Sequence, residues 1–140
     1  MSQKRDKIAA AVAQFQGREL DAHYLGYFEC FNRQLFYEAH EVLEVRWLAE
    51  RRGPKGPFYK GLIQLAGAFV HLQKSRLGPA AALFNLAHSN LEKYPSPHER
   101  LDVAYVLKII AQWLCRLESA QFSQNPLSAA TAPRLRLAAS

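Results

Sequence analysis

Apolar residues recur along the chain at the three- and four-residue spacing of amphipathic helices, in every segment between the glycine- and proline-rich breakers. The spacing predicts helices at about 3–16, 22–32, 36–51, 58–75, 79–91 and 97–119. No alternating apolar and polar pattern typical of strands competes with these segments. We therefore predict an all-α protein, a compact bundle of about five or six helices built on antiparallel helical hairpins.

The first helical hairpin has boundaries that can be read from single residues. Gly17 is expected to end the first helix, and Asp21 is expected to cap the second through its side-chain oxygen. Asn32 is expected to end the second helix, because asparagine tolerates the left-handed conformation that closes helices. Only the short turn 33–35 separates it from the next helix, so the two helices on either side must lie antiparallel.

Glycine and proline divide the second half of the chain. The run 53–57 reads Gly-Pro-Lys-Gly-Pro and separates two helices, and Pro79 suits the first position of the next one. Ser96 and Glu99 have the spacing of a capping box, with Pro97 at the first position of the last helix. This last helix is apolar nearly all round, so we expect it to be deeply buried or to meet a partner subunit in a homodimer.

The third predicted helix carries the densest group of aromatic, acidic and histidine side chains in the chain. On a helix, Phe36, Leu43 and Trp47 fall on one apolar stripe. His40 lies within that stripe and Glu44 lies at its edge one turn later, whereas an ordinary amphipathic helix keeps such groups on its far side. We expect this helix to be the centre of the fold.

Composition indicates a globular protein. The chain has 140 residues, of which 49% are hydrophobic, enough for one domain with a real core. We expect this domain at 1–120 and a flexible tail at 121–140, where Ser, Ala, Pro, Gln and Thr dominate. The net charge of +6 is dispersed, so nucleic-acid binding is not expected. We expect a cytoplasmic protein outside the membrane, because the sequence has no signal peptide or bilayer-spanning stretch and its cysteines have no metal or redox spacing.

Two short strings carry a resemblance to a known family. They are Tyr37-Glu38-Ala39-His40-Glu41-Val42-Leu43-Glu44, with Asn32 before it and Trp47 after it, and Gly61-Leu62-Ile63-Gln64-Leu65-Ala66, followed by His71. Together they resemble the prokaryotic domain-of-unknown-function family 309, over about 21–91 of this chain. The resemblance implies a compact, all-helical cytoplasmic domain and no established activity. Lys60 departs from the resemblance, which leads us to expect glutamine there.

The polar residues that could form a site come from the third and fourth predicted helices. The candidate site consists of Tyr37, Glu38, His40, Glu41, Glu44, Trp47, Gln64 and His71. Metal binding is one interpretation, with His40, Glu44 and His71 as candidate ligands, because helical residues at i and i+4 can present a nitrogen and an oxygen to one ion. Glu44 stands where the zinc motif His-Glu-x-x-His has its second histidine, so a divalent metal is an alternative and no cofactor is predicted.

Two other interpretations of the candidate site stay open. A histidine beside carboxylates and aromatic rings could line a small-ligand pocket or act as the general acid–base of a hydrolase-like enzyme, although no nucleophile with a paired base accompanies it. Alternatively, His40 donates to Glu44, Gln64 or a backbone carbonyl and only fixes helix packing. We predict a module that binds an unidentified small ligand or protein, with an enzyme as the alternative.

Overall fold

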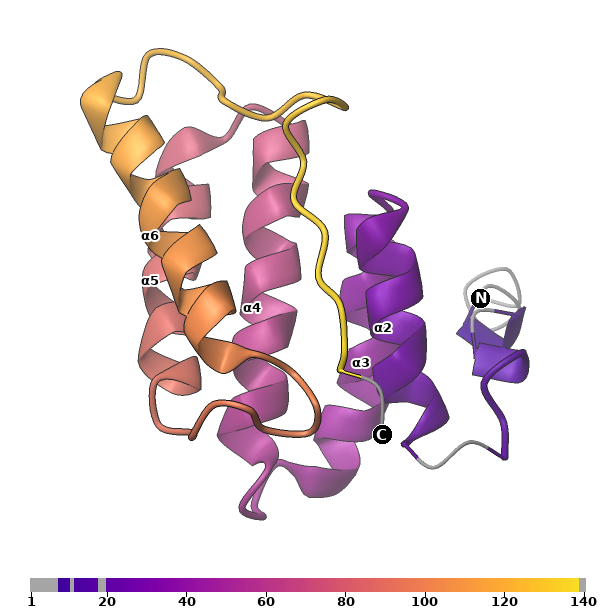
Figure 1. Ribbon diagram of the computed structural model, residues 1–140. Coiled ribbons are helices and arrows are strands. Elements are labelled where there is room, and N and C mark those ends of the chain that lie inside the picture. Colours follow the sequence, from indigo (N-terminus) through magenta and orange to yellow (C-terminus); the bar gives the residue numbers. More distant parts are fainter. Residues whose placement is uncertain (1–7, 11, 18–19, 139–140) are drawn as a thin grey trace.

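The computed structural model describes residues 8–10, 12–17 and 20–138 (Figure 1). Its helices are α2 (Ala22–Asn32), α3 (Phe36–Glu50), α4 (Gly56–Gln73), α5 (Leu77–Leu91) and α6 (Val103–Ser119). Of the helix predicted at 3–16, residues 8–10 and 12–13 are helical, 14–16 form a turn, and 3–7 and 11 lie outside the described residues. Over the described ranges there are isolated β-bridges but no strand, so the predicted all-α bundle is confirmed.

Helix α4, rather than α3, lies at the centre of the fold. Helices α3 and α5 both pack against α4, α2 packs against α3, and α6 packs against α5 (Figure 1). Eleven residues of α4 are buried, against five of α3. The C-terminal half of α3 leaves Val45 and Leu48 exposed, which corrects the expectation that this helix would be the centre.

The ring of Phe69 on α4 connects this helix to the other four. Its centroid lies 5.6 Å from that of Phe31 on α2, 5.0 Å from Phe36 on α3, 5.2 Å from Phe84 on α5 and 5.0 Å from Trp113 on α6. All five side chains are buried. The contacts to Phe31, Phe84 and Trp113 are edge-to-face, which is the arrangement that aromatic quadrupoles favour. A single aromatic cluster therefore holds the five helices together.

The hairpin of α2 and α3 forms as the sequence predicts, with one difference in its turn. The side chain of Asp21 accepts hydrogen bonds from the backbone of His23 and Tyr24, as a helix cap does. The helix ends at Asn32, but the left-handed residue is Gln34, with a φ of 62°. The side chain of Asn32 instead binds the backbone of a distant segment, described below.

The start of α6 differs from the prediction. The helix begins at Val103, and Asp102 caps it by accepting from a backbone N–H of the first turn. Glu99 cannot complete a capping box with Ser96, because its φ of 48° places it outside the helical region. The Ser96 hydroxyl instead donates to Asp102 and supports the true cap, and Pro97 lies in the preceding loop. Helix α5 begins at Leu77, two residues earlier than predicted, so Pro79 lies inside its first turn rather than at its first position.

The segment after α6 packs against the bundle, which corrects the expectation of a flexible tail at 121–140 for the residues that the structure describes. Leu135 is 1% exposed, and its backbone forms two hydrogen bonds with the side chain of Asn32. Asn125 donates to the carbonyl oxygen of Leu72 on α4, and Ala138 donates to that of Arg100. Figure 1 shows this segment in yellow as it crosses the face of the bundle. The polar composition of 121–140 gave no indication that Leu135 would be buried.

Helix α6 is one-sided rather than apolar all round. Its buried residues are Val103, Val106, Ile109, Ile110, Trp113 and Leu117. The opposite side is exposed and includes Tyr105 and Lys108. The outward face of α6 carries polar residues, so α6 does not need a partner subunit to bury its apolar side. The homodimer therefore stays a prediction. Among the helices that the structure describes, none is long and apolar enough to cross a membrane.

Candidate functional site

A groove of about 280 Å³ lies on the surface formed by α3, α4 and α5. Its polar lining residues are Tyr37, His40, Lys60, Gln64 and His71, and its remaining lining residues are Ile63, Gly67, Val70 and Leu83. Four residues of the predicted candidate site therefore meet in one groove, two from α3 and two from α4. Lys60 was outside that predicted site and is the additional polar residue.

Helical periodicity explains why the polar side chains of α4 meet in this groove. Lys60, Gln64, Gly67 and His71 recur at intervals of three or four residues, so they form one stripe along the helix. The opposite side of α4 carries Phe69 into the aromatic core. Since α3 and α5 pack on either side of α4, its polar stripe forms the floor of a groove instead of an open surface.

His40 lies beside two carboxylates of its own helix. Its Nδ1 is 3.2 Å from Oε1 of Glu41, and its Nε2 is 3.9 Å from Oε2 of Glu44. Glu41 is only 8% exposed, and the ring of Tyr37 stacks on the imidazole at 6.4 Å. The predicted hydrogen-bond partners of His40 were Glu44, Gln64 or a backbone carbonyl, whereas its closest carboxylate is the sequence neighbour Glu41. This pairing fixes the orientation of the imidazole at the edge of the groove.

The side chains of Gln64 and His71 differ in their hydrogen bonding. The side-chain amide of Asn90 on α5 donates to Oε1 of Gln64 at 2.7 Å, so α5 holds the Gln64 side chain in place. Nδ1 of His71 is buried and has no hydrogen-bond partner among the described residues. Burial lowers the pKa of His71 below its ordinary value of 6.5, and the positive charges of Arg76 and Lys74 lower it further. His71 is therefore neutral at neutral pH.

Lys60 is held against an aromatic ring. Its Nζ lies 4.4 Å from the centroid of the Trp47 ring, a cation–π contact between α4 and α3. Trp47 is partly buried and does not line the groove itself. Its role at the site is to position the ammonium group of Lys60.

The remaining predicted site residues do not join this groove. Glu38 lies on a different side of α3, where it lines a second hollow together with Cys30 and Arg33. Glu41 and Glu44 contact His40 without lining the groove. Within the described ranges, no three His, Cys, Asp or Glu side chains are grouped so that they could hold a metal ion, and this includes the candidate ligands His40, Glu44 and His71.

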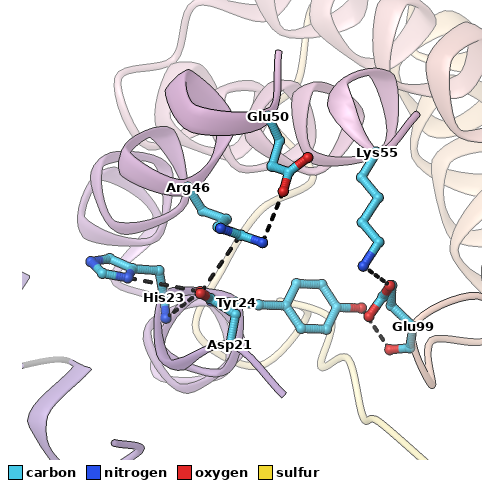
Figure 2. Close-up of polar contacts among 7 residues, drawn as sticks. All are labelled: Asp21, His23, Tyr24, Arg46, Glu50, Lys55 and Glu99. Carbon is cyan, nitrogen blue, oxygen red and sulfur yellow. Dashed lines mark hydrogen bonds and ion pairs between the residues drawn. The ribbon is translucent and has the colours of Figure 1, made fainter. Parts of the chain in front are cut away.

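Sequence reasoning missed a second polar cluster, centred on Arg46 (Figure 2). The guanidinium group lies 3.0 Å from Oε1 of Glu50 and 3.6 Å from Oδ2 of Asp21. Burial raises the pKa of Tyr59, which therefore keeps its proton. The spacing of Arg46 and Glu50 was a signal available in the sequence. The contact with Asp21 was not, because it depends on how α2 packs against α3.

The same region ties the loop before α6 to the rest of the fold. Lys55 Nζ lies 2.6 Å from Oε1 of Glu99, and the Tyr24 hydroxyl donates to the backbone carbonyl of Glu99 at 2.9 Å (Figure 2). Burial raises the pKa of Tyr24 far above its ordinary value, so this donor is retained. Since its charged groups pair with one another, we interpret this cluster as a structural connection between α2, α3 and the two loops.

The fold and the groove together define a small helical domain that presents a polar groove of ligand size on one face. Residues 24–83 match the family model described as "Domain of unknown function (DUF309)", so the resemblance seen in the sequence is confirmed over these residues. All the residues that line the groove fall within this match. Neither the curated proteins nor the solved structures contain a match to the chain.

Proposed function

We propose that the protein is a binding module that takes a small organic ligand in the groove between α3, α4 and α5. The observation that carries the proposal is the meeting of Tyr37, His40, Gln64 and His71, from two helices, in one concave site. The volume of about 280 Å³ is close to the lower end of the range for small-molecule sites. The lining joins five polar residues to four that are apolar or glycine, so the polar groups can orient a ligand whose body packs on the apolar ones.

The contacts behind the groove support a binding role. Glu41 orients His40 from one side, and Asn90 orients Gln64 from the other. Side chains that are held in this way lose little rotamer freedom when a ligand arrives, so more of the interaction free energy appears as affinity. The buried Nδ1 of His71, which has no described partner, is a polar atom that a rearranged ligand-bound site could satisfy.

Gly67 gives the proposal a direct test. It lies in the floor of the groove, and a Cβ at this position would come 3.2 Å from Cδ1 of Leu83. A larger side chain would therefore fill the groove, while leucine is a better helix former than glycine, which favours folding of Gly67→Leu. Val70→Phe fills the same groove from another lining position and serves as a second variant.

The probe for this test is hydrocinnamate, an aromatic ring with a short carboxylate chain, added at millimolar concentration and followed by calorimetry. We expect the parent to bind it and both groove-filling variants to lose binding while they remain folded by circular dichroism. Ala111→Leu on the exposed side of α6 is the matched control and should bind as the parent does. Equal binding by parent, Gly67→Leu and Val70→Phe would show that the groove is not the site, and no binding to the parent would contradict the proposal.

An acid–base enzyme is the second candidate, because His40 pairs with the carboxylate of Glu41 at 3.2 Å. Such a pair positions a histidine for proton transfer. Under this alternative, His40→Gln would abolish turnover of a bound ester or amide but leave its binding intact. We further propose a cytoplasmic location, which is supported by the free thiols of Cys30 and Cys115.

A further inference from the structure

We propose that the ligand is an organic anion, a small carboxylate with an apolar body, and that Lys60 recognises its charge. The inference rests on the ligand-binding groove proposed above and names the chemical class that the groove selects. It also makes Lys60 the specificity-determining residue of this groove.

The charge on the groove comes from one side chain. Of the described residues that line it, Lys60 alone carries a full positive charge and none is acidic. His71 adds no charge at neutral pH, because burial and two neighbouring cations lower its pKa. A groove with one cation and no lining carboxylate favours a ligand with one negative group.

Lys60 differs in its contacts from Lys55 and Arg46 and resembles Arg116, which lies over the ring of Trp113. Lys55 pairs with Glu99, and Arg46 pairs with two carboxylates. Among the residues that the structure describes, Lys60 has the ring of Trp47 as its contact and no carboxylate within ion-pair distance. A cation–π contact restrains the ammonium without neutralising it, so the charge remains available to an anion.

The rest of the groove indicates an apolar body next to the anionic group. Ile63, Val70 and Leu83 line it, and the absence of a side chain at Gly67 keeps its middle open. Lys60 and Gly67 lie on the same stripe of α4, separated by about 10 Å at the helical rise of 1.5 Å per residue. A carboxylate near Lys60 would therefore direct its apolar part along the stripe toward Gly67 and Val70. An inorganic anion would leave these apolar contacts unused.

The test compares a matched pair of probes, hydrocinnamate and its uncharged amide. We expect the parent to prefer the carboxylate by about three- to tenfold, the range for a charged hydrogen bond at a partly exposed site. Lys60→Gln should lower this ratio to about one by weakening carboxylate binding alone, because the amide does not use the charge. Lys108→Gln, an equal charge change on the exposed side of α6, should keep the parental ratio. Added salt should reduce the preference in the parent.

The outcomes separate this inference from the binding proposal. Equal affinities for the two probes in the parent, or a preference that survives in Lys60→Gln, would overturn the assignment to Lys60 while the groove still bound ligand. Loss of both probes in Gly67→Leu would support the groove itself. Inorganic phosphate should not compete with hydrocinnamate, and full competition by phosphate would show that the site recognises a bare anion instead.

Discussion

The side chain of Asn32 at the end of α2 forms two hydrogen bonds with the backbone of Leu135. Asn32 Nδ2 donates to the Leu135 carbonyl oxygen and the Leu135 N–H donates to Asn32 Oδ1, each at 2.7 Å, although 103 positions separate the residues in the chain. The amide side chain thus satisfies both polar groups of a buried residue. Asn32 therefore has a structural role, in which it attaches the C-terminal segment to the first hairpin.

We predict that Asn32→Ala destabilises the protein by about 1–3 kcal/mol, because Leu135 would keep a buried N–H and carbonyl without these partners. The melting temperature should fall by several degrees. Asn85→Ala is the matched control, because the Asn85 amide donates to a carbonyl within its own helix and its removal should change little. Parental melting of Asn32→Ala would show that the C-terminal segment does not stabilise the fold.

The pair of His40 and Glu41 gives a prediction that distinguishes a structural contact from a metal site. His40→Ala should lower the free energy of unfolding by about 1–2 kcal/mol, because the nearly buried Glu41 loses a hydrogen-bond partner. Glu44→Gln should change it by less than about 0.5 kcal/mol, because Glu44 is more exposed and 3.9 Å away. Thermal melts with and without zinc provide the measurement. A zinc-dependent stabilisation of the parent that both variants lose would instead support a metal site.

The buried position of His98 leads to a prediction of how the free energy of unfolding depends on pH. Its ring lies 4.5 Å from Phe58 and 4.8 Å from Tyr94, and burial lowers its pKa below 6.5 against the opposing effect of Glu99. The unfolded state then binds more protons than the folded state, so the free energy of unfolding should decrease as the pH falls below about 6.5. His98→Phe keeps a ring but removes the titrating group, and should reduce this slope. The free energy of unfolding can be measured by denaturant titration between about pH 5 and 7. If His98 stays protonated in the folded protein, the slope of this free energy against pH would be the same in the parent and in His98→Phe.

Local periodicity was sufficient to predict α2 to α5 within two residues of their observed bounds, since each buries one regular apolar face. The capping-box spacing placed the start of α6 at Pro97 with Ser96 as its cap, whereas Asp102 caps the helix. Local periodicity also could not predict contacts between distant positions, such as those of Asn32 with Leu135 and of Arg46 with Asp21. Such contacts depend on how the helices pack, which the spacing along one helix does not specify.

The candidate site was predicted in part for the same reason. His40 was recognised because it lies within the apolar stripe of its own helix, and Gln64 because it belongs to a string that carries the family resemblance. The prediction could not show that α3 and α5 would enclose the polar stripe of α4, so it missed Lys60 and included Glu38, which lies elsewhere. The pairing of Gln64 with Asn90 on α5 was hidden as well, because the two lie on different helices.

The central claim, that the groove binds a small organic ligand, is tested most directly by mapping hydrocinnamate onto backbone amide resonances by heteronuclear NMR. We predict that the largest shifts occur at residues around the groove, including His40, Gln64 and Gly67, and that they saturate with a single affinity. Gly67→Leu should remove them. Shifts that are absent at millimolar probe, or that centre on the hollow at the end of α6 around Arg116, would contradict the claim.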